Sequence, residues 1–115
     1  MKVQLSQIAY ARSGDKGSGA NVGVIAYTAA GYELLRASLT AEAAQEFFQR
    51  LGATNVKRYE LPNLLALNFI LQNVLDGGAS LSLRIDPQGK ALGQALLEME
   101  LDVPQAQLSQ MREPS

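Results

Sequence analysis

The sequence alternates between two hydrophobic periods, and this alternation limits the folds that it can adopt. Residues 80–86 alternate strictly between apolar and polar side chains, which is the pattern of a strand with one wet face. Residues 40–52 instead repeat apolar side chains every three or four positions, between a good N-cap, Thr40, and a helix-ending Gly52. Strands separated by helices predict a layered α/β sandwich.

The remaining segments extend this pattern. Strands are predicted over residues 3–11, with a bulge near Gln7, over 21–28 and over 56–61, where Pro62 ends the strand. Residues 12–20 are predicted to form a loop and residues 29–31 a turn. The pattern of residues 32–39 is ambiguous between helix and strand. Residues 64–75 are apolar nearly all round and predict a helix buried on several sides or facing a partner. A last helix is predicted to start at Asp86-Pro87 and to bury Leu92, Ala95, Leu96 and Met99.

The length of 115 residues fits one domain. We assign this domain to residues 1–102 and expect residues 103–115, in which the pattern dissolves, to be a loosely ordered tail. The net charge of −1 favours neither nucleic-acid nor membrane binding. The start lacks the apolar run of a signal peptide and no segment is long enough to span a membrane, so we expect a cytoplasmic protein.

The chain contains no cysteine and no histidine. These absences exclude Ser-His-Asp and Cys-His catalysis and the usual zinc, copper and iron sites. Any proton transfer must use Asp, Glu, Lys, Tyr or water. We expect no metal and no cofactor.

The most distinctive motif is Arg12-Ser13-Gly14-Asp15-Lys16-Gly17, with Gly19 close behind. Glycines let backbone N–H groups approach an anion, and Arg12 and Lys16 add positive charge. The spacing matches neither a phosphate-binding P-loop nor a dinucleotide fingerprint. A plain turn between two strands, in which Asp15 caps backbone amides, explains the same residue types.

Other polar residues have structural explanations beside functional ones. Asn63 follows Pro62 and suits a helix N-cap, whereas Asn68 lies in an apolar segment and needs hydrogen-bond partners there. Four charged residues on two predicted strands are expected to form cross-strand ion pairs, namely Arg58, Glu60, Arg84 and Asp86. The four tyrosines either line a pocket or pack in the core, namely Tyr10, Tyr27, Tyr32 and Tyr59.

Three sequence blocks resemble the AtuA-like family. They are residues 11–17 followed by 21–26, then 58–63 with 66–69 and Gly77-Gly78, and finally 83–86 with Gly89-Lys90 and Leu96-Leu97. The resemblance covers roughly residues 5–100, in the small module found at the C-terminal end of acyclic terpene utilisation AtuA proteins and also as a separate chain. It implies an α+β ferredoxin-like two-layer sandwich of about four strands and two or three helices. A permuted arrangement, in which the first strand completes the sheet, would reconcile this fold with the predicted element order.

The resemblance also implies a role in acyclic terpenoid catabolism, where substrates are coenzyme A thioesters. The first hypothesis is therefore an accessory subunit that binds a larger AtuA-like partner. The second is a small hydratase- or lyase-type enzyme with Asp15 and Lys16 as catalytic residues. Its acyl-CoA or carboxylate ligand would contact six residues, namely Arg12, Ser13, Gly14, Gly17, Asn21 and Asn68. The third is a non-catalytic module that assembles into a homo-oligomer.

Overall fold

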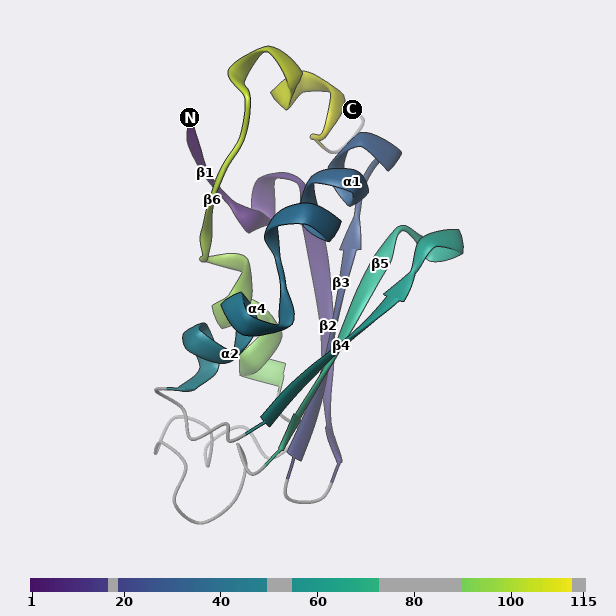
Figure 1. Ribbon diagram of the computed structural model, residues 1–115, viewed down its shortest axis with the longest axis vertical. Coiled ribbons are helices and arrows are strands. Elements are labelled where there is room, and N and C mark those ends of the chain that lie inside the picture. Colours follow the sequence, from purple (N-terminus) through teal and green to yellow (C-terminus); the bar gives the residue numbers. More distant parts are fainter. Residues whose placement is uncertain (17–18, 50–54, 73–89, 113–115) are drawn as a thin grey trace.

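A four-stranded antiparallel sheet forms the centre of the protein (Figure 1). The computed structural model describes residues 1–16, 19–49, 55–72 and 90–112. In spatial order the sheet contains β2 (Ala9–Lys16), β3 (Gly19–Ala26), β5 (Ala66–Gln72) and β4 (Asn55–Leu61). β2 and β3 form a hairpin, and β4 and β5 form a second hairpin through the 3-10 turn η2 (Pro62–Leu64).

Within the described residues, three helices cover one face of this sheet, namely α1 (Ala29–Ser38), α2 (Ala41–Gln49) and α4 (Lys90–Leu97). Two of them, α2 and α4, lie to its left in Figure 1. Side chains point to alternate faces of a strand, so every second residue of β3 and β5 enters the core. The buried strand residues that face the helices are Ala20, Val22, Val24, Ala26, Leu67, Phe69 and Leu71. They pack against helix residues that include Leu35, Phe48, Leu92 and Leu96.

Threonine side chains start the first two helices. The Thr28 Oγ1 accepts a hydrogen bond from the Gly31 N–H at 3.0 Å, and the Thr40 Oγ1 accepts one from the Ala43 N–H at 3.0 Å. Each hydroxyl thus satisfies one of the N–H groups that a helix leaves unpaired at its N-terminus.

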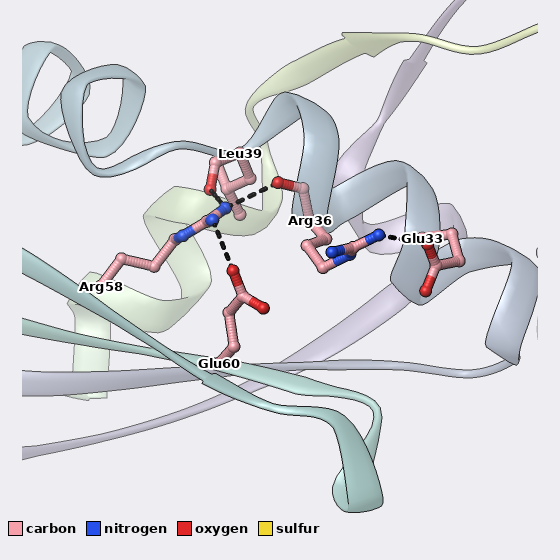
Figure 2. Close-up of polar contacts among 5 residues, drawn as sticks. All are labelled: Glu33, Arg36, Leu39, Arg58 and Glu60. Carbon is pink, nitrogen blue, oxygen red and sulfur yellow. Dashed lines mark hydrogen bonds and ion pairs between the residues drawn. The ribbon is translucent and has the colours of Figure 1, made fainter.

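Arg58 closes the other end of α1 (Figure 2). One guanidinium nitrogen donates to the carbonyl oxygens of Arg36 at 2.8 Å and Leu39 at 3.1 Å, and the other donates to the Glu60 carboxylate at 3.0 Å. The carbonyls belong to the last turn and C-cap of the helix, where the backbone carries partial negative charge. Arg58 therefore ties the edge strand β4 to the helix layer.

A smaller sheet joins the two ends of the described chain. β1 (Lys2–Gln4) pairs antiparallel with β6 (Glu100–Asp102), and the 3-10 turn η1 (Leu5–Gln7) leads from β1 into β2. Beyond β6, the segment expected to be a loosely ordered tail contains the 3-10 helix η3 (Gln105–Gln110), and its Leu108 and Met111 are buried in the core.

The predicted two-layer α+β class is confirmed. β3, the helices α1 and α2, the β4–β5 hairpin and α4 follow the β-α-β-β-α order of a ferredoxin-like fold. β2 pairs with β3 at the free edge and supplies the remaining strand from the N-terminal side. This is the permuted arrangement expected from the sequence.

Several local predictions are confirmed. Thr40 is the N-cap of α2, residues 21–26 and 56–61 lie in strands, and the last helix buries Leu92 and Leu96. The break near Gln7 is real, although the backbone forms the turn η1 there instead of a bulge in one continuous strand.

Other local predictions are wrong. Residues 66–72 form strand β5 and not a helix: β3 and β4 pair with both edges of this strand, and an apolar segment with apolar side chains on both faces has no period that separates strand from helix. Residues 12–16 and 19–20 are paired strand and not loop. Residues 29–31 begin α1 and not a turn, and residues 32–38 continue that helix.

Some predictions lie outside the described residues. They concern Gly17, the helix end at Gly52, the strand over 80–86 with Arg84 and Asp86, and the helix entry at Pro87. Arg58 forms an ion pair with Glu60 on its own strand, and the predicted pairing with Arg84 and Asp86 lies outside the described residues.

Candidate functional site

The sheet face opposite the helices is called the open face below. It carries three of the polar residues singled out in the sequence, namely Arg12, Asn21 and Asn68. β2 turns Ala11 and Ser13 toward α4: a Cβ built on Gly93 of that helix would lie 3.2 Å from the Ser13 Oγ and 3.3 Å from the Ala11 Cβ. The alternate residues, Arg12 and Gly14, therefore lie on the open face. The motif is thus divided between the two faces of one strand.

The strand register brings residues from all four strands into rows on the open face. Arg12 lies opposite Gly23, Gly23 opposite Asn68, and Asn68 opposite Tyr59. A neighbouring row runs through Tyr10, Ile25, Ala66 and Leu61. Two hairpins that are far apart in the sequence, β2–β3 and β4–β5, thus contribute to one surface.

Asn21 and Asn68 are joined by a side-chain hydrogen bond, in which the Asn21 Nδ2 donates to the Asn68 Oδ1. The residues lie on the adjacent strands β3 and β5, two residues apart in the register: Asn21 lies opposite Ile70, and Asn68 lies opposite Gly23. Asn68 thereby obtains the polar partner that its place in an apolar segment requires. The structure brings Arg12, Asn21 and Asn68 together as the sequence motifs suggest, and their role in binding remains a prediction.

A hollow of about 340 Å³ lies at the centre of the open face. One end is polar and the other is apolar, since Arg12 and the asparagine pair lie beside the aliphatic side chains of β3, η2 and β5. The lining residues are Tyr10, Arg12, Asn21, Gly23, Ile25, Leu61, Leu64, Ala66, Leu67 and Asn68.

Gly23 forms part of the floor, and local packing does not require a glycine there. A Cβ at this position would meet nothing closer than 3.8 Å, and φ lies outside the left-handed region. A glycine inside a strand costs roughly 0.5–1 kcal/mol relative to alanine. Gly14, on the same face, has nothing within 4 Å of its hypothetical Cβ. Because Gly23 and Gly14 have no side chains, the surface beside Arg12 is hollowed.

Large apolar side chains surround the hollow and are exposed. Relative exposure is 39% for Tyr10, 50% for Tyr59, 39% for Leu61 and 64% for Leu64. The Tyr10 ring also packs against Tyr27 with centroids 5.6 Å apart. Leu64 projects from a turn in which the next residue, Leu65, has a left-handed backbone with φ of 54°.

The open face carries positive charge in a chain whose net charge is −1. Arg12 and Lys57 lie there, and within the described residues neither forms a hydrogen bond or an ion pair through its side chain. The acidic side chains of the described part lie on helices, on the helix-facing side of β4 or around β6, and they are Glu33, Glu42, Glu46, Glu60, Glu98, Glu100 and Asp102. The local field on the open face thus favours an anion.

Other predicted site residues fall elsewhere. Ser13 is placed on the helix side, away from Arg12, because neighbouring residues of a strand face opposite ways. Asp15 and Lys16 pair through their backbones with Ala20 and Gly19, and their side chains lie outside the described part. Gly17 lies outside it altogether.

Sequence reasoning missed the apolar half of the hollow. Ile25 and Leu61 have no polar group that singles them out, and residues 64–75 were predicted to be helical, which removes Ala66 from the sheet and Leu64 from the turn beside it. One signal was present: an isolated glycine inside the strand pattern of residues 21–26 indicates either a bulge or a close approach.

The described ranges, residues 1–16, 19–49, 55–72 and 90–112, contain neither a metal-binding cluster nor a membrane-spanning helix. No group of three or more Asp or Glu side chains in them could hold a metal ion. None of the helices in them has the length and apolarity needed to cross a bilayer.

Comparison with known proteins identifies the family. No curated protein and no solved structure gives a significant match. Residues 3–102 match the family described as the AtuA ferredoxin-like domain, and this match includes all four strands of the main sheet and every lining residue of the hollow. The chain therefore belongs to the AtuA ferredoxin-like domain family.

Proposed function

We propose that the chain is an accessory subunit that docks through its open face onto a larger AtuA-like protein. The process would be the catabolism of acyclic terpenoids or related acyl-CoA compounds. The observation that carries the docking is the ring of exposed apolar side chains around the hollow, on a sheet face that none of the described elements covers. The terpenoid context comes from the resemblance to AtuA proteins.

The composition of this face supports a protein partner. Protein interfaces are enriched in tyrosine and arginine and depleted of acidic residues at their centres. The open face has Tyr10 and Arg12 on one edge strand, β2, and Tyr59 on the other, β4, and it has no acidic side chain among its described residues. A partner that covered Leu64 would remove from water a side chain that is 64% exposed.

The docking is tested by isothermal titration calorimetry with a separately purified AtuA-like large chain. Leu64→Glu places a charge in the apolar ring and is expected to weaken binding at least tenfold. Gln45→Glu is the matched control, because it adds the same charge to an exposed position on α2, behind the sheet. It is expected to change the affinity by less than twofold.

Two results would contradict the proposal. If the large chain binds but Leu64→Glu has no more effect than Gln45→Glu, the open face is not the interface. If the large chain does not bind and sedimentation instead shows a homo-oligomer that Leu64→Glu dissociates, the face joins copies of this chain.

A further inference from the structure

The strongest feature left unexplained by docking is the hollow itself. A flat interface needs neither a strand glycine without a packing reason nor a cation beside it. We propose that the hollow is a binding site for a small aliphatic carboxylate, with the carboxylate on the Arg12 guanidinium and the hydrocarbon chain over β3 and β5. This site would belong to the isolated chain and does not depend on the proposed partner.

Arg12 supplies the anion-binding group. Its side chain lines the hollow, is exposed, and forms no ion pair or hydrogen bond within the described residues. A guanidinium presents a planar fork of N–H donors that matches a carboxylate with two parallel hydrogen bonds. None of the described residues that line the hollow is acidic, so none of them competes for the guanidinium.

The asparagine pair supplies further hydrogen-bonding capacity. The Asn68 Oδ1 accepts from Asn21, which leaves the Asn68 Nδ2 as a donor in the same row as Arg12, on the other side of Gly23. An amide side chain carries two N–H donors, and one of them is sufficient to reach a second carboxylate oxygen. The polar end is thus complementary to a carboxylate and not to a cation.

The other end accepts hydrocarbon. Ile25, Ala66 and Leu64 line it, and Tyr10 closes one side. Neighbouring strands lie about 4.8 Å apart, so β2 and β5 are separated by about 10 Å across the sheet. A chain of about six carbons spans the distance from the guanidinium to the aliphatic end, and the hollow's volume is at the lower limit of small-molecule sites.

Gly23 gives independent support. A Cβ at this position would lie at an ordinary contact distance of 3.8 Å from its nearest atoms, and β-branched residues favour strands, yet the chain carries a glycine here. The glycine keeps the middle of the row between Arg12 and Asn68 free of side chain. A ligand that crosses the row needs this space, whereas the fold does not.

The proposal is tested by NMR titration of the isolated full chain with hexanoate, hexanamide and acetate. Hexanoate is expected to bind saturably, at least tenfold more tightly than hexanamide, which lacks the charge, and than acetate, which lacks the chain. The largest amide shifts are expected at Gly23 and Asn68. Equal affinities for hexanoate and hexanamide, or no saturable shifts, would overturn the proposal.

Three variants separate the site from a general charge effect. Arg12→Gln is expected to lower hexanoate affinity at least tenfold, whereas Lys57→Gln removes the same charge from the open face outside the hollow and is expected to change it less than twofold. Gly23→Val fills the floor and should abolish binding, with a melting temperature equal to or above that of the parent. If both charge variants lose affinity equally, or if folded Gly23→Val still binds, the site is not where we place it.

Discussion

Replacing Arg58 by methionine tests whether the contact between β4 and α1 is a main support of the two-layer fold. Methionine keeps most of the apolar stem and removes the guanidinium, so the change isolates the polar contacts shown in Figure 2. The parent side chain is 18% exposed and donates to two carbonyl oxygens at the end of α1. Arg58→Met leaves those carbonyls without their cationic donor.

The expected loss follows from the exposure of each contact. A hydrogen bond to a charged group contributes about 1.5–3 kcal/mol, and we count only the partly buried bond to the Leu39 carbonyl in full, because water can replace the donor at the exposed Arg36 carbonyl. A cation at a helix C-terminus adds about 0.3–1 kcal/mol. The pair with the half-exposed Glu60 adds about 0–1 kcal/mol. These contributions sum to about 2–5 kcal/mol, and because the site is partly open to water we expect Arg58→Met to lower the free energy of unfolding by an amount at the lower end, about 2–3 kcal/mol.

Urea and thermal unfolding followed by circular dichroism measure this loss. A domain of this size changes its melting temperature by about 4 °C per kcal/mol, so a decrease of about 8–12 °C is expected. Glu60→Gln removes only the ion pair and should cost less than about 1 kcal/mol, and Arg58→Lys should fall between the two. If Arg58→Met costs no more than Glu60→Gln, the carbonyl contacts do not support the fold and the reasoning is wrong.

Three further predictions concern single groups. Tyr32→Phe is expected to leave stability unchanged or raise it by up to about 1 kcal/mol, because the buried Tyr32 hydroxyl has no hydrogen-bond partner within the described residues; a larger loss in urea unfolding would contradict this. Gly93→Val should cost about 1–3 kcal/mol through collision with Ala11 and Ser13, and adding Ser13→Gly should restore part of the melting temperature. A hydrogen bond from the Met1 amino group, together with its charge, holds the pKa of Asp102 below the ordinary 3.8. The pair therefore contributes stability above that pH and loses it as pH falls through the lower folded-state pKa, so acid unfolding should be less steep below about pH 4 in Asp102→Asn, and an unchanged acid limb would refute this.

Secondary structure was predicted correctly where a single local sequence signal dominated, such as a helix-capping residue or a strict alternation of apolar and polar side chains. Thr40 caps α2 because its hydroxyl can reach a backbone N–H three residues on, and the alternation of residues 56–61 needs only neighbouring strands. The errors have a common cause. Residues 66–72 and 12–16 adopt strands because they pair with β3, and neither the apolar period nor the glycine content of a single segment encodes that pairing.

For the same reason, the sequence predicted the polar residues of the candidate site but not its apolar residues. Polar residues in unusual settings, Arg12, Asn21 and Asn68, were visible in the sequence, and the structure brings them together. Their apolar neighbours Ile25 and Leu61 look like any strand residues until the register places them in one row with Tyr10.

The division of the Arg-Ser-Gly motif between two faces of β2 has a consequence for how this chain tolerates insertions and deletions. Side chains change face with every residue, so deleting Gly14 would shift Arg12 and Ser13 by one place toward the turn and exchange their faces. The guanidinium would then take the place of Ser13 against α4 near Gly93, and Ser13 would take the place of Gly14 opposite Asn21. Length in this strand is therefore constrained more tightly than composition: a single omitted residue should damage both the helix packing and the binding surface, whereas a substitution damages only one of them.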